Sequence, residues 1–130
     1  MDEQSSPFVI FIVEDDDEEK LLLTYELQAG GLAKGAHFFS DTYELINYFY
    51  SREQNSPLSL ILLNGFMQKN NIRDAVANIK SVQELRTVPL VVMVYSQDEK
   101  EHIRSYDLDV SGYVIKPINA QILKRFLENR

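Results

Sequence analysis

The sequence contains no cysteine among its 130 residues, which excludes disulfide bonds, thiolate metal sites and cysteine nucleophiles. This absence fits an intracellular protein. Glycine is also sparse, and neither a G-x-G-x-x-G nor a Walker pattern is present. The one pair of adjacent glycines, Gly30 and Gly31, stands at a predicted helix end. The sequence therefore gives no support for a flavin or another small ligand held on a phosphate-binding glycine loop.

Histidine occurs only twice, as His37 and His102. We expect His102 to lie on a charged, exposed helix, where Asp98 and Ser96 do not complete a catalytic triad with it. The sequence therefore disfavours an independent hydrolase, and we expect no enzyme activity.

Positive charge is in deficit, with 13 basic against 20 acidic residues and a net charge of −7. Such a chain repels nucleic-acid phosphate, so we expect no nucleic-acid partner. The longest apolar run, residues 8–13, is far shorter than the roughly 20 residues of a membrane span. Residues 1–7 carry acids instead of the basic start of a signal peptide, which predicts a cytoplasmic protein without membrane contact. We expect residues 1–7 to form a tail and residues 8–130 a single domain.

Five short apolar runs, rich in β-branched and aromatic residues, predict buried strands. They lie at residues 8–13, 36–39, 58–63, 90–95 and 112–115. Each is followed by a segment with helical spacing of its apolar residues. Strands that alternate with helices in this way predict a single-domain α/β fold, a doubly wound five-stranded parallel sheet flanked by five helices.

The helix starts carry capping residues. Asp16 or Asp17, Asp41 and Asn119 precede the first, second and fifth helices, and the fourth begins near Gln97 or Asp98. Leucines and a tyrosine recur along the first helix at Leu21, Leu22, Tyr25 and Leu27, and the third is expected to carry Ala75, Val76, Ile79, Val82 and Leu85. Ile103 and Tyr106 should face inward from the fourth helix.

Polar residues follow three of the predicted strands. Glu14 and Asp15 come after the first, Asn64 after the third and Lys116 after the fifth. Ligand sites of doubly wound sheets lie at the carboxyl ends of the strands, so we expect these side chains to meet there. Two carboxylates suit a hard divalent cation, although an acidic run also serves as a solvated helix start.

The segments around these residues resemble the receiver domain of two-component response regulators. The similarity rests on residues 13–16, 60–64, 89–94 and 111–117, above all the run Gly112-Tyr-x-x-Lys116-Pro117, and it extends over residues 8–129. It implies the flavodoxin-like (CheY-like) variant of the doubly wound fold and a role in phosphorelay signal transduction.

The resemblance also implies roles for individual residues. In the family, an aspartate at the end of the third strand accepts a phosphoryl group beside Mg²⁺. Here Glu14 and Asp15 match the acidic pair that holds the metal, with the backbone carbonyl of Phe66 as a further ligand. Lys116 matches the lysine that grips the phosphoryl oxygens, and Tyr113 matches the aromatic switch residue.

Two central positions depart from the family pattern. Asn64 stands at the acceptor position, and a carboxamide has no ionised oxygen nucleophile. Val94 stands where a serine or threonine hydroxyl is expected; a shifted alignment would assign that role to Ser96. With one carboxylate fewer, we expect weakened Mg²⁺ binding and no other cofactor. We also expect Lys116 to form an ion pair with Glu14 and Asp15.

We therefore interpret the chain as an atypical pseudo-receiver that acts by protein–protein interaction without aspartyl phosphorylation. The partner would be a histidine kinase, phosphotransfer protein or effector bound on the face of the fourth helix, fifth strand and fifth helix. That face would draw on basic and aromatic residues, namely Lys100, Arg104, Tyr106, Tyr113, Lys124 and Arg125.

Several alternatives stay open. The chain could be a phosphorylatable receiver switch whose acceptor aspartate is replaced here, and Asn64-Gly65 is a dipeptide prone to deamidation, which would restore an acid. Residues 46–50 hold more aromatic side chains than one core stripe needs, and so offer a second candidate surface. A homodimer is also open.

Overall fold

The computed structural model describes residues 8–52, 57–68 and 71–128. Its strands are β1 (Ile10–Val13), β2 (Ala36–Phe39), β3 (Leu60–Asn64), β4 (Leu90–Val94) and β5 (Gly112–Ile115). Its helices are α1 (Asp17–Ala29), α2 (Thr42–Ser51), α3 (Ile72–Lys80), α4 (Gln97–Arg104) and α5 (Ala120–Glu128). Short 3₁₀ segments lie at η1 (Ala33–Gly35) and η2 (Gln83–Leu85). The predicted tail, residues 1–7, lies outside the described residues, as do residues 129–130.

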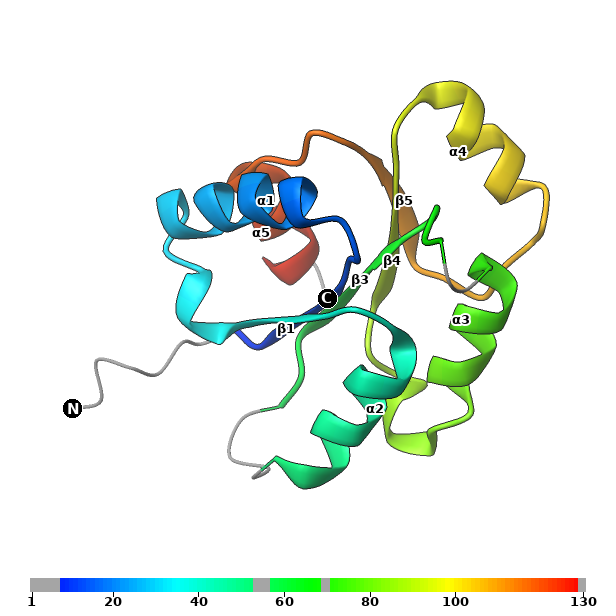
Figure 1. The fold of residues 1–130 in the computed structure, drawn as a ribbon, viewed down its shortest axis with the longest axis horizontal. Helices are drawn as coiled ribbons and strands as arrows, with labels where there is room; N and C mark the ends of the chain where they lie inside the picture. The colour runs from blue at the N-terminus through cyan, green and yellow to red at the C-terminus, as the bar shows by residue number, and fades with distance from the viewer. Residues whose placement is uncertain (1–7, 53–56, 69–70, 129–130) are drawn as a thin grey trace.

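The five strands form one parallel sheet in the order β2-β1-β3-β4-β5 (Figure 1). Helices α1 and α5 cover one face, and α2, α3 and α4 cover the other (Figure 1). This arrangement confirms the predicted doubly wound fold. The strand order reverses between β1 and β3, which places the working crevice at their carboxyl ends.

The strands supply two separate hydrophobic layers because alternate side chains point to opposite faces. Phe11 of β1 and Val92 of β4 pack under α2, α3 and α4, whereas Ile12 and Met93 pack under α1 and α5. All the residues of β1, β3 and β4 are buried. Burial on both faces explains why their sequences are continuous apolar runs instead of alternating ones.

The predicted helix caps are confirmed. Asp16 accepts a hydrogen bond from the backbone N–H of Glu19, Asp41 from that of Glu44, and Asn119 from that of Ile122. Helix α4 begins at Gln97, as one of the two predicted starts, and its capping residue is Ser96. Among the described residues, no helix is long and apolar enough to cross a membrane.

The apolar face of α1 differs from the predicted one. Leu23 and Leu27 are buried, while Leu21, Leu22 and Tyr25 are more than half exposed. Consecutive residues of a helix are 100° apart, so three successive leucines cannot all reach the sheet. The buried residues of the helix are the i, i+4 pair Leu23 and Leu27, whereas Leu21 and Tyr25 stay exposed and Leu22 borders the cavity beside Lys116.

The third helix is shorter than predicted. It ends at Lys80, and Val82 and Leu85 lie beyond it. Val82 has an extended backbone, and Leu85 belongs to η2, yet both side chains are buried. Buried apolar residues therefore continue beyond the end of α3, because the segment that leads to β4 also packs on the core.

Candidate functional site

Three of the predicted polar residues meet at the carboxyl ends of the strands. Glu14 follows β1, Asn64 ends β3 and Lys116 follows β5. One carboxylate oxygen of Glu14 accepts a hydrogen bond from Nζ of Lys116 at 2.8 Å, and the other accepts one from Nδ2 of Asn64 at 2.8 Å. The exposed fraction is 1% for Glu14 and 2% for Asn64. We call these three residues the strand-end pocket.

The carboxamide of Asn64 uses both of its ends. Nδ2 donates to Glu14, and Oδ1 accepts from the backbone N–H of Phe66 at 3.0 Å. Glu14 also accepts from the backbone N–H of Asp16. A neutral amide suits this place because it offers a donor to the buried carboxylate of Glu14, which an ionised aspartate would repel.

The side chain of Lys116 is largely shielded from solvent although it carries a charge. Its side chain is 7% exposed and also lies 3.5 Å from a carboxylate oxygen of Glu19. Its ammonium packs 4.5 Å from the centroid of the Tyr95 ring. Burial by itself would lower the pKa of Lys116, but the hydrogen bond and charge of Glu14, together with the charge of Glu19, raise that pKa above its ordinary value.

The second acid of the predicted ion pair is a different residue. Lys116 pairs with Glu14 as expected, while Asp15 accepts a hydrogen bond from the backbone N–H of Gln68 at 3.1 Å. The carboxylate that joins Glu14 around the ammonium belongs to Glu19. Sequence reasoning missed Glu19 because it treated the acidic run as a solvated helix start. The available signal was position: Glu19 lies in the first turn of α1, directly above the strand end.

The predicted metal ligands do not form an open oxygen site. Both carboxylate oxygens of Glu14 already accept hydrogen bonds, and Asp15 is bonded to the loop after β3. Within the described parts of the chain, no three His, Cys, Asp or Glu side chains are grouped to hold a metal. Mg²⁺ takes several oxygen ligands in near-octahedral geometry, and weakened binding of this ion by Glu14, Asp15 and the Phe66 carbonyl stays a prediction.

Position 94, the last residue of β4, carries no hydroxyl. Val94 is fully buried and pairs with Ile115, and the backbone N–H of Lys116 donates to the carbonyl of Val94. Ser96, the alternative for the hydroxyl role, instead caps α4, where its Oγ accepts from the backbone N–H of Glu99. Tyr113 pairs with Val92, lies half-buried against the core, and has a pKa raised by burial.

Gly65 holds the chain close to β4. Its N–H donates to the carbonyl of Met93 at 2.9 Å, and a Cβ at this position would lie 2.8 Å from Cδ1 of Ile103. Deamidation of Asn64 requires this same nitrogen to attack the Asn64 side chain. Both groups are held in hydrogen bonds, so the folded chain opposes the reaction.

The predicted partner face is built around α4, β5 and α5. Arg104 and Arg125 are exposed, and Lys100, Lys124, Tyr106 and Tyr113 are half-buried. Tyr106 lies after the end of α4; its hydroxyl is 2.9 Å from Nε2 of His102, and the guanidinium of Arg73 stacks on its ring at 4.1 Å. We call these six residues the basic face: Lys100, Arg104, Tyr106, Tyr113, Lys124 and Arg125.

The aromatic residues of α2 divide between core and surface. Phe49 is buried, and Tyr48 packs edge-on against Phe11 with ring centroids 5.7 Å apart. Tyr43 and Tyr50 are more than 60% exposed. Within the second candidate surface, residues 46–50, Asn47 and Tyr50 are therefore the exposed residues, and Tyr43 lies outside that range.

Comparison with known proteins shows which proteins the chain resembles. No protein-family model matches the chain. The probable methanogenesis regulatory protein FilR2 of Methanothrix harundinacea is 27% identical over 97% of this chain and 83% of its own length. The response regulator Rcp1 of Synechocystis is 29% identical over 98% of this chain and 88% of its own length.

A solved structure gives the same result. The bacteriophytochrome response regulator RtBRR matches with a TM-score of 0.76 and 26% identity, over 94% of this chain and 76% of that one. Sequence and structure thus agree over nearly the whole chain. In sequence and in fold, the chain is therefore similar over nearly its whole length to response-regulator receiver domains of two-component signalling.

Proposed function

We propose that this receiver domain signals by binding a protein partner and does not undergo aspartyl phosphorylation at position 64. The observation that carries the proposal is the hydrogen bonding of Asn64. Its nitrogen donates to Glu14 and its oxygen accepts from the backbone N–H of Phe66, so the acceptor position holds a neutral amide that is hydrogen-bonded at both ends. An amide lacks the ionised oxygen that attack on phosphorus requires.

Two further features support the same conclusion. Buried Val94 offers no hydroxyl to a phosphoryl oxygen. The ammonium of Lys116 is already neutralised by Glu14 at 2.8 Å and Glu19 at 3.5 Å. Position 64 therefore lacks an ionised nucleophile, position 94 lacks a hydroxyl, and the lysine cation is already paired.

Recognition would then fall to the surface. Arginine and tyrosine are enriched at the energetic centres of protein interfaces, and the basic face presents both on an otherwise acidic protein. A histidine kinase, phosphotransfer protein or effector with an acidic contact surface would complement it. Such a partner needs no phosphoryl group on this domain.

The test is phosphate uptake from acetyl phosphate. The unaltered protein, with Mg²⁺ present, is followed by intact mass beside the Asn64→Asp variant and the Asn64→Asp/Val94→Thr double variant. We expect no mass change in the unaltered chain. Addition of a phosphoryl group to it would refute the proposal.

A second candidate is a phosphorylatable receiver whose acceptor is replaced in this chain. It is favoured by Glu14, Lys116 and Tyr113, which stand at the positions that the family pattern requires. Prompt uptake by Asn64→Asp alone, with Val94 unchanged, would support this candidate, because the remaining site would then be competent. Peptide mapping of aged protein separates a replaced residue from one restored by deamidation.

A further inference from the structure

We propose that Glu19 and Tyr95 hold the Lys116 ammonium on Glu14, so that the pocket stays closed to a phosphoryl group even when a carboxylate stands at position 64. This inference deepens the proposed function by naming the residues that keep the site inactive. It makes Glu19 and Tyr95 positioning residues that act through Lys116.

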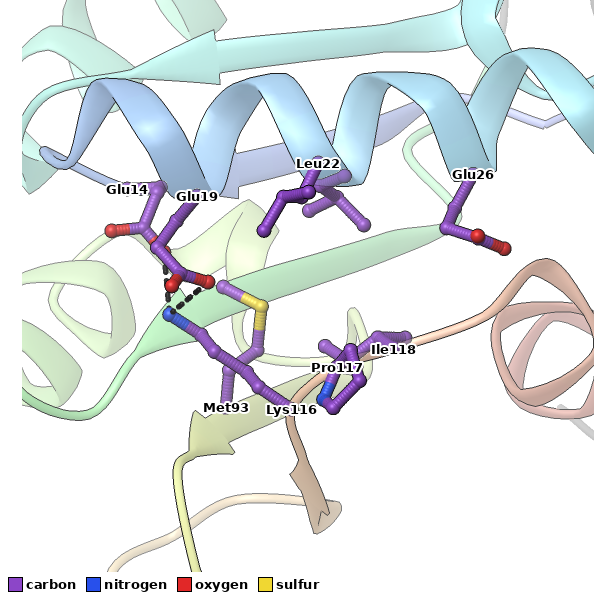
Figure 2. A pocket seen from close by; sticks show the side chains of 9 residues that line it. Glu14, Glu19, Leu22, Glu26, Met93, Lys116, Pro117 and Ile118 are labelled. Atoms are coloured by element: carbon purple, nitrogen blue, oxygen red, sulfur yellow. Dashed lines mark hydrogen bonds and ion pairs between the residues drawn. The ribbon is translucent and has the colours of Figure 1, made fainter.

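The ammonium is enclosed on three sides. Glu14 lies at 2.8 Å, Glu19 at 3.5 Å, and the face of the Tyr95 ring at 4.5 Å from Nζ. Figure 2 shows Glu14 and Glu19 both reaching the lysine nitrogen from the side of α1. A cation held by two carboxylates and an aromatic face loses all three contacts when it moves.

The stem of Lys116 is equally confined. It borders a cavity of about 110 Å³ whose other walls are largely apolar, including Leu22, Met93, Pro117 and Ile118 (Figure 2). Such surroundings suit the methylene groups. Of the three acids that line the cavity, Glu14, Glu19 and Glu26, the ammonium is paired with the first two.

In that position the ammonium is engaged by carboxylates of other residues. Lys116 bonds to Oε1 of Glu14, while Asn64 bonds to Oε2 of the same carboxylate. To bind a phosphoryl group at residue 64, the ammonium would have to give up its bond to Oε1 for one to a phosphoryl oxygen. Glu19 and Tyr95 oppose this movement.

Tyr95 is itself fixed at the pocket mouth. Its backbone N–H donates to Oε1 of Glu99 in the first turn of α4, and its ring lies 6.5 Å from the ring of Phe66. Tyr95 is 46% exposed and Phe66 39%. Two large, partly exposed rings, one after β4 and one after β3, therefore lie near each other at the carboxyl ends of the strands.

The first test measures access to Lys116 without any phosphorylation. The unaltered protein is treated briefly with an amine-acetylating reagent, and mass spectrometry compares acetylation of Lys116 with that of half-buried Lys100. We expect Lys116 to react several-fold more slowly. The variants Tyr95→Ala and Glu19→Gln should raise its relative reactivity several-fold, and Tyr95→Phe, which keeps the ring face but removes the hydroxyl, should raise it less than Tyr95→Ala.

Matched controls separate the contacts of Glu19 and Tyr95 with Lys116, which we call the cage, from a general loosening of the fold. Glu18→Gln removes a neighbouring acid of α1, and Tyr25→Ala removes an aromatic residue that is 59% exposed. Both should leave the ratio of Lys116 to Lys100 unchanged. Equal reactivity of Lys116 in the unaltered chain and in both cage variants would overturn the inference.

The second test uses the Asn64→Asp/Val94→Thr background. Uptake from acetyl phosphate requires a carboxylate oxygen of residue 64 to bond to phosphorus while the bond from phosphorus to acetate breaks and acetate leaves. Adding Tyr95→Ala and Glu19→Gln should speed this step about tenfold, as expected when contacts worth about 1.4 kcal/mol are lost. An unchanged rate in a phosphate-accepting background would contradict the inference.

The two proposals fail in different ways. Phosphate uptake by the unaltered chain refutes the proposed function, and the acetylation ratio still decides whether Lys116 is held. If Asn64→Asp/Val94→Thr accepts phosphate as fast as the same variant with Tyr95→Ala and Glu19→Gln added, the inference about Glu19 and Tyr95 is refuted. The proposed function is not affected by that result. If neither accepts phosphate, the acetylation ratio alone decides the cage.

Discussion

The strand-end pocket and the basic face use polar residues in opposite ways. In the pocket, Glu14, Asn64 and Lys116 are buried and bond to one another. On the basic face, Arg104 and Arg125 are exposed to solvent. The pocket is satisfied internally, while the face has charges available to a partner.

This difference has energetic consequences. Removing one member of a buried ion pair leaves a charge without compensation, which is strongly destabilising. An exposed charge is hydrated in either case and contributes little to stability. Substitutions in the pocket should therefore act mainly on folding, and substitutions on the face mainly on binding.

The largest expected effect comes from Lys116→Met. It keeps the length of the stem but leaves buried Glu14 without its cation, at a cost of about 3 kcal/mol in the free energy of unfolding. Urea denaturation measures this loss. The control Lys124→Met, on the basic face, should stay within about 0.5 kcal/mol. Equal effects of the two variants would remove the distinction between the regions.

The next effect is that of Asn64→Asp. The variant loses the donor to Glu14 and places a second carboxylate beside it, which should cost about 2 kcal/mol at neutral pH. Asn47→Asp, at an exposed position of α2, serves as the control and should be nearly neutral. Urea midpoints of the two variants at equal salt decide the matter, and an unchanged midpoint for Asn64→Asp would show that Asn64 is not bonded to Glu14.

Gly65→Ala tests how closely β3 and β4 approach beneath the pocket. The new Cβ would lie 2.8 Å from Cδ1 of Ile103 and 3.1 Å from the carbonyl oxygen of Met93. We expect a loss of about 1–2 kcal/mol from the forced shift. Thermal unfolding of Gly65→Ala with and without Ile103→Val measures it, because shortening Ile103 should recover part of the loss. No recovery would place the strain at the backbone of Met93.

At the edge of the basic face, Arg73→Ala removes the guanidinium that stacks on Tyr106 at 4.1 Å. A half-exposed cation–π pair of this kind contributes about 0.5–1 kcal/mol. The double-mutant cycle of Arg73→Ala with Tyr106→Leu isolates the pair by urea denaturation. A coupling near zero would mean that the stacking does not stabilise this face.

The smallest effect concerns His37, which lies outside both regions. Burial, assisted by the charge of Arg52, lowers its pKa below the ordinary value of 6.5. The unfolded chain therefore binds the proton more tightly, so this contribution to stability is full above pH 6.5 and declines as the pH falls toward the folded-state pKa. Urea midpoints between pH 7.5 and pH 5, compared with those of His37→Gln, should show a smaller decline in the variant. Parallel curves would exclude His37 as the source.

Much of this architecture could be read from local sequence patterns. Strand β2 and strand β5 were predicted with the bounds that the structure shows, and the caps at Asp16, Asp41 and Asn119 were correct. Continuous apolar runs and capping residues are local signals, so a single sequence carries them. The exposed leucines of α1 and the early end of α3 were missed because burial there depends on packing against other elements.

The residues of the candidate site also fall into two groups, those that local sequence identifies and those that only tertiary packing brings together. The sequence by itself determined which residues stand at the strand ends, namely Glu14, Asn64 and Lys116, because strand position and residue type are both local properties. Only the tertiary structure decided that Glu19 and Tyr95 surround the lysine while Asp15 bonds elsewhere. Those contacts join β1, α1, β4 and β5 across long separations in sequence, and their geometry follows from how the sheet and its helices pack.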